Sequence, residues 1–121
     1  MTIKSYRDLK VWQKAIDLVV VSYHLTKAFP KAETYALSAQ IQRSAVSIPA
    51  NIAEGHGREH LGDYLHHLSI ANGSLLELET HLLIANRLSY LQKSDLESVH
   101  ELTSEVGRML AGLIRKLKTS E

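Results

Sequence analysis

The chain has 121 residues, of which 45% are hydrophobic and 22% are charged, so we expect one globular domain spanning residues 1–121. It contains no cysteine, which excludes disulfides, thiolate zinc sites and a cysteine nucleophile. Its formal net charge of +1 identifies no partner. No apolar segment approaches the ~20 residues of a membrane span, and the N-terminus lacks the apolar core of a signal peptide. We therefore expect a cytoplasmic protein that does not contact a membrane.

Hydrophobic residues spaced three and four apart predict a first helix over residues 6–28. Its apolar stripe comprises Leu9, Trp12, Ile16, Val19 and Tyr23. Ser5, followed by Asp8 three residues later, is typical of a capping box at the start of a helix. Pro30 is expected to stop this helix because proline has no backbone N–H group.

A second helix is predicted over residues 32–55, with an apolar stripe of Leu37, Ile41, Ala45, Ile48 and Ile52. Pro49 lies within this pattern, and we expect it to kink the helix rather than end it, because the periodicity continues beyond it. Gly55 and Gly57 are expected to end the helix by adopting the left-handed conformation.

A third helix is predicted over residues 60–89, with a seam of Leu61, Leu65, Leu68, Leu75 and Leu82. Gly73 lies in the middle of this helix, where glycine costs ~1 kcal/mol relative to alanine, and close approach of a neighbouring backbone would account for it. A fourth helix is predicted over residues 95–118. There Ser94 and Glu97 form a second capping-box pattern, and the apolar residues are Leu96, Val99, Val106, Met109, Leu113 and Leu117.

No segment shows the alternating pattern of a β-strand, and the connections between the four predicted helices are short. Short connections make consecutive helices antiparallel neighbours. We therefore predict an all-α fold, an antiparallel up-down-up-down four-helix bundle whose second helix is kinked near Pro49.

A polar stripe runs beside the apolar stripe of the second helix. Its members fall within an arc of roughly 80°, and they are Gln40, Arg43, Ser47, Asn51 and Glu54. Ser74, Glu77 and Glu79 lie near the leucine seam of the third helix. In an antiparallel bundle Arg43 lies level with Asp17, so Arg43 is predicted to form a buried ion pair with Asp17 or with Glu79. We interpret these residues as a network that sets the register of the bundle or forms a subunit interface; a ligand pocket and a surface for nucleic acid or protein are the alternatives.

Basic residues gather at the end of the predicted bundle where the first and third helices begin and the other two end. They are Lys4, Arg7, Lys10, Lys14, Arg58, Arg115, Lys116 and Lys118, accompanied by His56 and His60. The carboxylates of Asp8, Glu54, Glu59, Asp63 and Glu121 offset part of their charge. Such a patch attracts phosphates even when the net charge is near zero. The alternative is a solvated end whose cations lie favourably in the helix dipoles.

The sequence lacks the arrangements that metal and phosphate chemistry need. His60, Asp63 and His67 share one helix face, but exposed histidines near a turn are the commoner case. Only Glu97 and His100 have the spacing of a di-iron bundle, which needs two such pairs. No P-loop or dinucleotide-binding glycine motif is present. We therefore predict neither a metal nor a cofactor.

Several short motifs occur in a characteristic order: Tyr6-Arg-Asp-Leu-Lys-Val-Trp-Gln13, Phe29-Pro30, Ser47-Ile-Pro-Ala-Asn-Ile-Ala-Glu-Gly55 and Ala71-Asn-Gly-Ser-Leu-Leu-Glu-Leu-Glu79. In this order they resemble the four-helix-bundle proteins encoded within intervening sequences of bacterial large-subunit (23S) ribosomal RNA genes. The resemblance implies a bacterial protein, a left-handed antiparallel bundle and a homopentameric ring, without accepted catalytic residues or an established molecular function. Asn72 departs from the family pattern, in which arginine or another residue is expected, and it has no assigned role.

Three hypotheses of function follow. The first is a non-enzymatic homo-oligomer that binds RNA or DNA through its basic end; a related group of pentameric bundles, the accessory proteins of diversity-generating retroelements, associates with nucleic acid. The second is a structural or adaptor protein that binds another protein, with the polar stripe at a subunit interface. The third is an enzyme with Glu54, Glu77 or Glu79 as a general base near Arg43. We disfavour the enzyme because an adjacent arginine makes a carboxylate a poor base and no nucleophile stands beside it.

Overall fold

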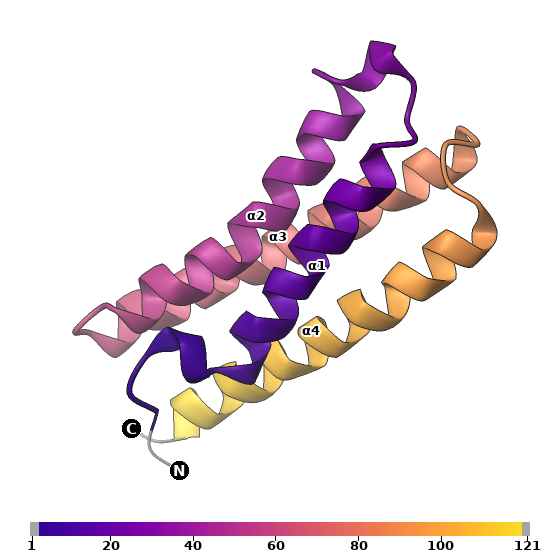
Figure 1. Cartoon of the computed structure of the whole chain (residues 1–121). Helices are drawn as coiled ribbons and strands as arrows, with labels where there is room; N and C mark the ends of the chain where they lie inside the picture. The colour runs from indigo at the N-terminus through magenta and orange to yellow at the C-terminus, as the bar shows by residue number, and fades with distance from the viewer. Residues whose placement is uncertain (1–2, 120–121) are drawn as a thin grey trace.

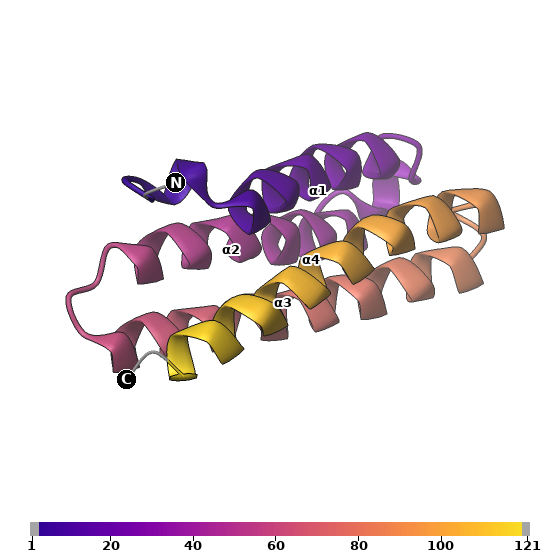
Figure 2. The same cartoon turned by 90° about the horizontal axis from the view of Figure 1, so that it is seen from below.

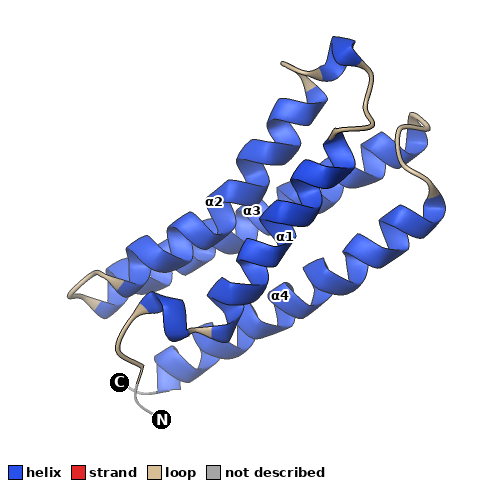
Figure 3. Cartoon of the chain, in the orientation of Figure 1, coloured by secondary structure: helices blue, strands red, loops and turns tan. Residues whose placement is uncertain are grey.

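The structure is a computed structural model that describes residues 3–119 (Figure 1). It contains two short 3-10 helices, η1 (Tyr6–Asp8) and η2 (Lys31–Glu33), and four α-helices: α1 (Lys10–Thr26), α2 (Leu37–His56), α3 (Leu61–Arg87) and α4 (Lys93–Thr119). No β-strand occurs within the described range (Figure 3). Consecutive α-helices run in opposite directions and are joined at alternating ends of the bundle (Figures 1 and 2). The predicted all-α four-helix bundle is confirmed.

Each α-helix packs against two neighbours. The backbones of α1 and α3 both approach those of α2 and α4 closely, whereas the backbones of the diagonal pairs lie further apart. The space enclosed between the helices is filled by aliphatic and small side chains, whose burial drives the association of the four amphipathic helices. The fully buried large side chains include Leu18, Ile41, Ile48, Ile52, Leu68, Leu78, Leu82, Val106 and Leu110.

The first helix begins later than predicted, at Lys10 rather than at residue 6, and it ends at Thr26. The predicted capping box is present, because the Oγ atom of Ser5 accepts from the N–H group of Arg7 and the carboxylate of Asp8 accepts from the N–H group of Ser5. It caps η1, however, and the extended backbone of Leu9 separates η1 from α1. A capping box satisfies the first amide groups of any helical turn, so the pattern locates a turn and not the length of the helix that follows.

The second helix also begins later than predicted, because η2 precedes it, and it runs through the buried Pro49 to His56. It ends where the glycines were predicted to end it, but the proposed reason is wrong. Gly57 has a φ angle of −81°, and no glycine within residues 3–119 has a positive φ angle. The kink near Pro49 stays a prediction.

The last two helices differ from the prediction by one to two residues at each end. α4 begins at Lys93, so Ser94 lies within its first turn, and the capping box of Ser94 and Glu97 is wrong. Asp95 makes one of the two hydrogen bonds of a capping box instead, because its Oδ2 atom accepts from the N–H group of Gln92 at 3.3 Å.

The apolar stripe of α2 is confirmed, but that of α1 is wrong by about one residue. The buried line of α1 is Val11, Ala15, Leu18, Ser22 and Thr26. Tyr23, predicted to be in the core, is 43% exposed. The hydroxyl of Ser22 donates to the carbonyl of Leu18 at 2.8 Å, and that of Thr26 donates to the carbonyl of Tyr23 at 3.0 Å. Because their own helix satisfies these hydroxyls, they can be buried, and hydrophobicity alone does not detect them.

Candidate functional site

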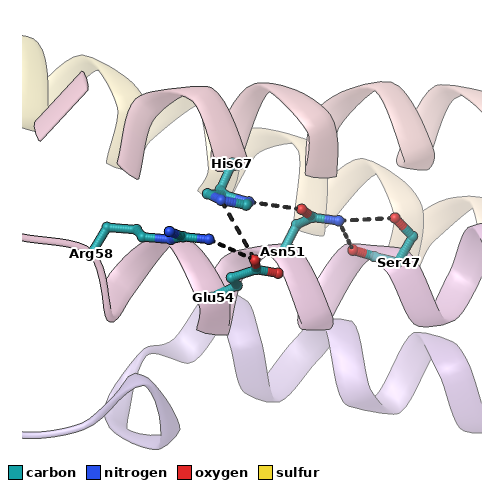
Figure 4. A network of polar contacts seen from close by, with 5 residues as sticks. All are labelled: Ser47, Asn51, Glu54, Arg58 and His67. Carbon is teal, nitrogen blue, oxygen red and sulfur yellow. Dashed lines mark hydrogen bonds and ion pairs between the residues drawn. The ribbon is translucent and has the colours of Figure 1, made fainter. Parts of the chain in front are cut away.

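A chain of polar contacts lies between α2 and α3 (Figure 4). At its centre, the Nδ2 atom of Asn51 donates to the carbonyl and Oγ of Ser47 at 2.9 and 3.0 Å. The Oδ1 atom of Asn51 lies 3.0 Å from Nδ1 of His67. Because an amide oxygen can only accept, Nδ1 of His67 is the donor in this contact. The network therefore fixes both the tautomer of the imidazole and the orientation of the amide.

The polar network extends from this centre in both directions along the helix pair. Towards the middle of the bundle, the hydroxyl of Ser74 in α3 donates to Oγ of Ser47 at 2.8 Å. Towards the α2–α3 turn, Nε2 of His67 lies 3.8 Å from Oε1 of Glu54, and the same oxygen accepts from Arg58 at 2.8 Å (Figure 4). The network is thus partly buried at Ser47 and His67 and exposed at Glu54 and Arg58.

The two helices approach closely beside this network. A Cβ atom at Gly55 would lie 2.7 Å from Cβ of His67 and 3.2 Å from the carbonyl oxygen of Tyr64, so only glycine fits here without movement of α3. A close approach was predicted at Gly73 instead, and that prediction is wrong, because nothing lies within 4 Å of a Cβ atom placed there. Close helix packing is therefore required at the level of His67 and not at the middle of α3.

The structure brings several of the predicted polar residues together. Ser47, Asn51, Glu54 and Ser74 all belong to the polar network. Glu79 contacts α4 instead. Its Oε2 atom accepts from the hydroxyl of the buried Thr103 at 2.9 Å and lies 3.7 Å from Nδ1 of His100. The predicted polar residues therefore form two separate sets of contacts, one between α2 and α3 and the other between α3 and α4.

The predicted buried ion pair of Arg43 is wrong. Arg43 is exposed, and within residues 3–119 it pairs with neither Asp17 nor Glu79. Gln40 and Glu77 are also exposed. Arg43 lies on the outer edge of α2, beside a groove of about 480 Å³ that is also lined by Tyr23, Ala39, Gln42, Val46 and Ser47. The polar stripe of α2 covers a wider arc than the part of α2 that contacts α3. Gln40 and Arg43 lie outside that contact and face solvent.

Two members of the network were not predicted to belong to it. His67 was interpreted as an exposed histidine near a turn, but only 14% of its side chain is exposed. Arg58 was assigned to the basic patch alone. The seven-residue spacing of His67 and Ser74 places both on one face of α3, and this spacing is the signal that identifies His67.

The cations predicted to gather at one end lie in elements that meet there. η1, the start of α3 and the ends of α2 and α4 all lie at the same end of the bundle (Figures 1 and 2). Nζ of Lys14 lies 3.6 Å from Oε1 of Glu105, and the guanidinium of Arg7 lies over the ring of Tyr6. By contrast, no residue within 3–119 forms an ion pair with Lys10, Arg115 or Lys118. Glu121, expected to offset part of this charge, lies outside the described residues.

Two tyrosines have raised pKa values. Burial raises the pKa of Tyr64, which packs against Gly55. Tyr90, in the α3–α4 connection, donates its hydroxyl to Oε2 of Glu33 at 2.9 Å, and this hydrogen bond is the main reason for the raised pKa of Tyr90, followed by burial. Both hydroxyls therefore stay protonated further into the alkaline range than in an unfolded chain.

The described part of the chain holds no cluster of metal-ligating side chains, and Arg43 forms no ion pair there with Glu54, Glu77 or Glu79. Within residues 3–119 no group of three or more histidine, cysteine, aspartate or glutamate side chains is placed to hold a metal ion. Among the described residues, no helix combines the length and the apolar character that crossing a membrane requires. Glu54 and Glu79 bind other partners, and neither contacts Arg43. The fold and its polar residues thus define a class of protein: a four-helix bundle with a polar network between two of its helices and a group of exposed cations at one end.

The comparisons with known proteins identify the family within this class. The sequence model of the 23S rRNA-intervening sequence protein family matches residues 7–112, so the chain belongs to this family and the resemblance is confirmed. The structure of the chain is similar to the crystal structure of a protein with unknown function from the S23 ribosomal protein family of Bacteroides thetaiotaomicron VPI-5482. The identity is 28%, the match covers 87% of this chain and 95% of that chain, and the TM-score is 0.81. A comparison of the sequence with curated proteins found no match.

Proposed function

We propose that this chain is a non-enzymatic adaptor that self-associates and binds RNA or DNA through the basic end of the bundle. The observation that carries the proposal is the meeting of η1, α2, α3 and α4 at one end, where Lys10, Arg115 and Lys118 have no ion-pair partner among residues 3–119. Unpaired, exposed cations attract phosphate groups and release condensed counterions when they bind nucleic acid.

Self-association strengthens this proposal. One copy presents a small basic patch and a net charge of only +1. A ring repeats the patch, so that one strand contacts several copies and binds with an affinity above that of any single copy. The family resemblance suggests five copies in the ring.

The test is the solution mass from light scattering, with and without a mixed RNA pool, at low and at moderate salt. A ring that gains mass with RNA and releases it as the salt concentration rises supports the proposal. The informative variant is Lys4→Glu with Lys10→Glu at the basic end. Its matched control is Lys27→Glu with Lys31→Glu, the same charge change just after α1 and at the start of η2, at the opposite end of the bundle. Equal loss of binding in both variants, or no binding by the wild-type protein, would refute the proposal.

A second candidate function is a structural adaptor for another protein, with the outer edge of α2 at a subunit interface. The observation that favours it is a group of exposed apolar side chains on α1 and α2, comprising Val20, Tyr23 and Val46, with Arg43 beside them. Aromatic residues and arginine are enriched at protein interfaces.

Substitution of this edge distinguishes the second candidate from the first. Arg43→Ala and Val46→Glu are expected to change the oligomeric mass while leaving the affinity of any RNA binding per copy unchanged. Both side chains are exposed, so the fold itself should tolerate the changes. Variants whose mass and melting temperature both equal those of the wild type would contradict an interface at this edge.

A further inference from the structure

An open groove lies between α3 and α4 near the basic end. It has a volume of about 440 Å³ and is lined by Asn72, Ala111, Ile114, Arg115, Lys118 and Thr119. Figure 2 shows the C-terminal half of α4 lying alongside the first half of α3, where these residues occur. The volume is within the range of about 300–1,000 Å³ that small-molecule sites occupy.

The lining of this α3–α4 groove combines three kinds of chemistry. Ala111 and Ile114 supply aliphatic surface. Arg115 and Lys118 are exposed cations one helical turn apart, and no described residue forms an ion pair with either. None of the six lining residues is acidic, so nothing in the groove repels an anion.

The third component is the amide of Asn72. It is exposed and has no hydrogen-bond partner within residues 3–119, whereas Asn51 uses both its nitrogen and its oxygen inside the polar network. A side-chain amide presents a donor and an acceptor side by side, which is the pattern that pairs with two atoms on the edge of adenine. Asn72 can therefore read a base edge, a role for which Asn51 has no free atoms.

We propose that the α3–α4 groove binds one nucleotide unit, with its base on Ala111 and Ile114, the base edge on Asn72, and the phosphate on Arg115 and Lys118. The inference rests on the proposed binding of nucleic acid and narrows it. A base inside a duplex is stacked on its neighbours and cannot enter a groove, whereas a base in a single strand can turn out of the stack. The protein therefore prefers single strands to duplexes.

The test measures fluorescence anisotropy with a labelled oligoadenylate, as a single strand and as a duplex with oligouridylate. Asn72→Ala is expected to weaken binding of the single strand by about fivefold or more and to leave duplex binding unchanged. Arg115→Glu with Lys118→Glu is expected to weaken both. Gln40→Ala, which removes another exposed amide, is the matched control and should bind as the wild type does. Thermal melts check that each variant is folded, which their exposed positions favour.

A second arm titrates adenosine monophosphate by calorimetry and separates the two proposals. Binding of both strands with unchanged affinities in Asn72→Ala overturns the groove and leaves the proposed function standing. Binding of the free nucleotide that depends on Asn72, without binding of any strand, supports the nucleotide site and overturns the proposed nucleic-acid function. A wild-type protein that binds neither strand nor nucleotide overturns both.

Discussion

The two sides of α3 use their polar residues differently. On the side facing α2, the side chains from Ser74 through Asn51 to Glu54 form an unbroken set of contacts, and Gly55 lets the helices approach closely. On the side facing the end of α4, Asn72, Arg115 and Lys118 form no hydrogen bond or ion pair through their side chains within residues 3–119 and lie around an open groove. The first arrangement holds two helices together, and the second leaves donors and charges available to a ligand.

This difference shows that the same residue type has different roles in two neighbouring helices. Asn51 and Asn72 are both side-chain amides on the helix pair α2–α3, yet of the two only Asn51 has both its nitrogen and its oxygen engaged within the described residues. A polar group whose partners are internal contributes to stability, and its loss leaves those partners unsatisfied. Stability measurements should therefore respond strongly to the loss of Asn51 and weakly to the loss of Asn72.

The largest effect on stability is expected from Gly55→Ala. Its added Cβ atom would lie 2.7 Å from Cβ of His67, so α2 and α3 must move apart. We expect a loss of about 2 kcal/mol or more in the free energy of unfolding, measured by urea denaturation followed by circular dichroism. Gly73→Ala is the matched control. Because its Cβ atom meets open space, it should stabilise the helix by up to ~1 kcal/mol. Equal effects of the two substitutions would contradict the close approach at Gly55.

Asn51→Ala is expected to have the next largest effect. It removes the only described partner of Nδ1 of His67 and leaves Ser47 with fewer hydrogen bonds. The expected loss is about 1–3 kcal/mol in the free energy of unfolding, again from urea denaturation. Gln40→Ala, which removes an exposed amide from the same helix, should change stability by less than about 0.5 kcal/mol. A loss confined to Gln40→Ala would show that the network does not stabilise the bundle.

Stability is expected to fall above about pH 10. The folded protein raises the pKa values of Tyr64 and Tyr90, so it binds their protons more tightly than the unfolded chain does. This contribution is fully present below the pKa of an unfolded tyrosine and is lost as the pH rises through the folded pKa values. Melting temperatures measured from neutral to alkaline pH test it. Tyr90→Phe, which cannot donate to Glu33, should show a shallower alkaline decline; an unchanged slope would exclude that hydrogen bond as a cause.

The smallest effect is expected from Arg58→Ala at the exposed end of the network. The side chains of Arg58 and Glu54 are 47% and 54% exposed, so solvent screens their ion pair. Its removal should cost less than about 0.5 kcal/mol in the free energy of unfolding.

The same substitution also serves as a comparison for Lys118→Ala in RNA binding. Lys118→Ala should reduce affinity more than Arg58→Ala does, because Glu54 already neutralises Arg58. The reverse order would place the phosphate contacts at the α2–α3 turn instead.

The number and order of the helices were predictable from the sequence because hydrophobic periodicity is a local property. All four helices lie where the pattern predicts them, although α1 and α2 begin later because the 3-10 helices η1 and η2 precede them. The buried face of α1 was predicted wrongly because Ser22 and Thr26 satisfy their own hydroxyls and pack inside. A scale of hydrophobicity places such residues outside.

The polar network was predictable in part. The sequence grouped Ser47, Asn51 and Glu54 of α2 into one polar network with residues of α3, and contacts of all three with α3 exist. Antiparallel geometry placed Arg43 level with Asp17, but level residues form an ion pair only if both helices rotate them towards each other. Arg43 is turned to solvent.

Four helices, their order, and the candidate residues of a polar stripe and a basic end all follow from the amino-acid sequence alone. Whether a segment forms a helix, and where its apolar stripe lies, depends on residues within a few positions along the chain. A single amino-acid sequence therefore contains the information needed to predict both. Three features became visible only in the packed bundle: His67 completes a polar network, Gly55 permits a close approach of α2 and α3, and Asn72 lines an open groove with Arg115 and Lys118. The reason is physical: the rotation of each helix about its axis is set by the packing of all four together, and small rotations decide which polar groups find partners.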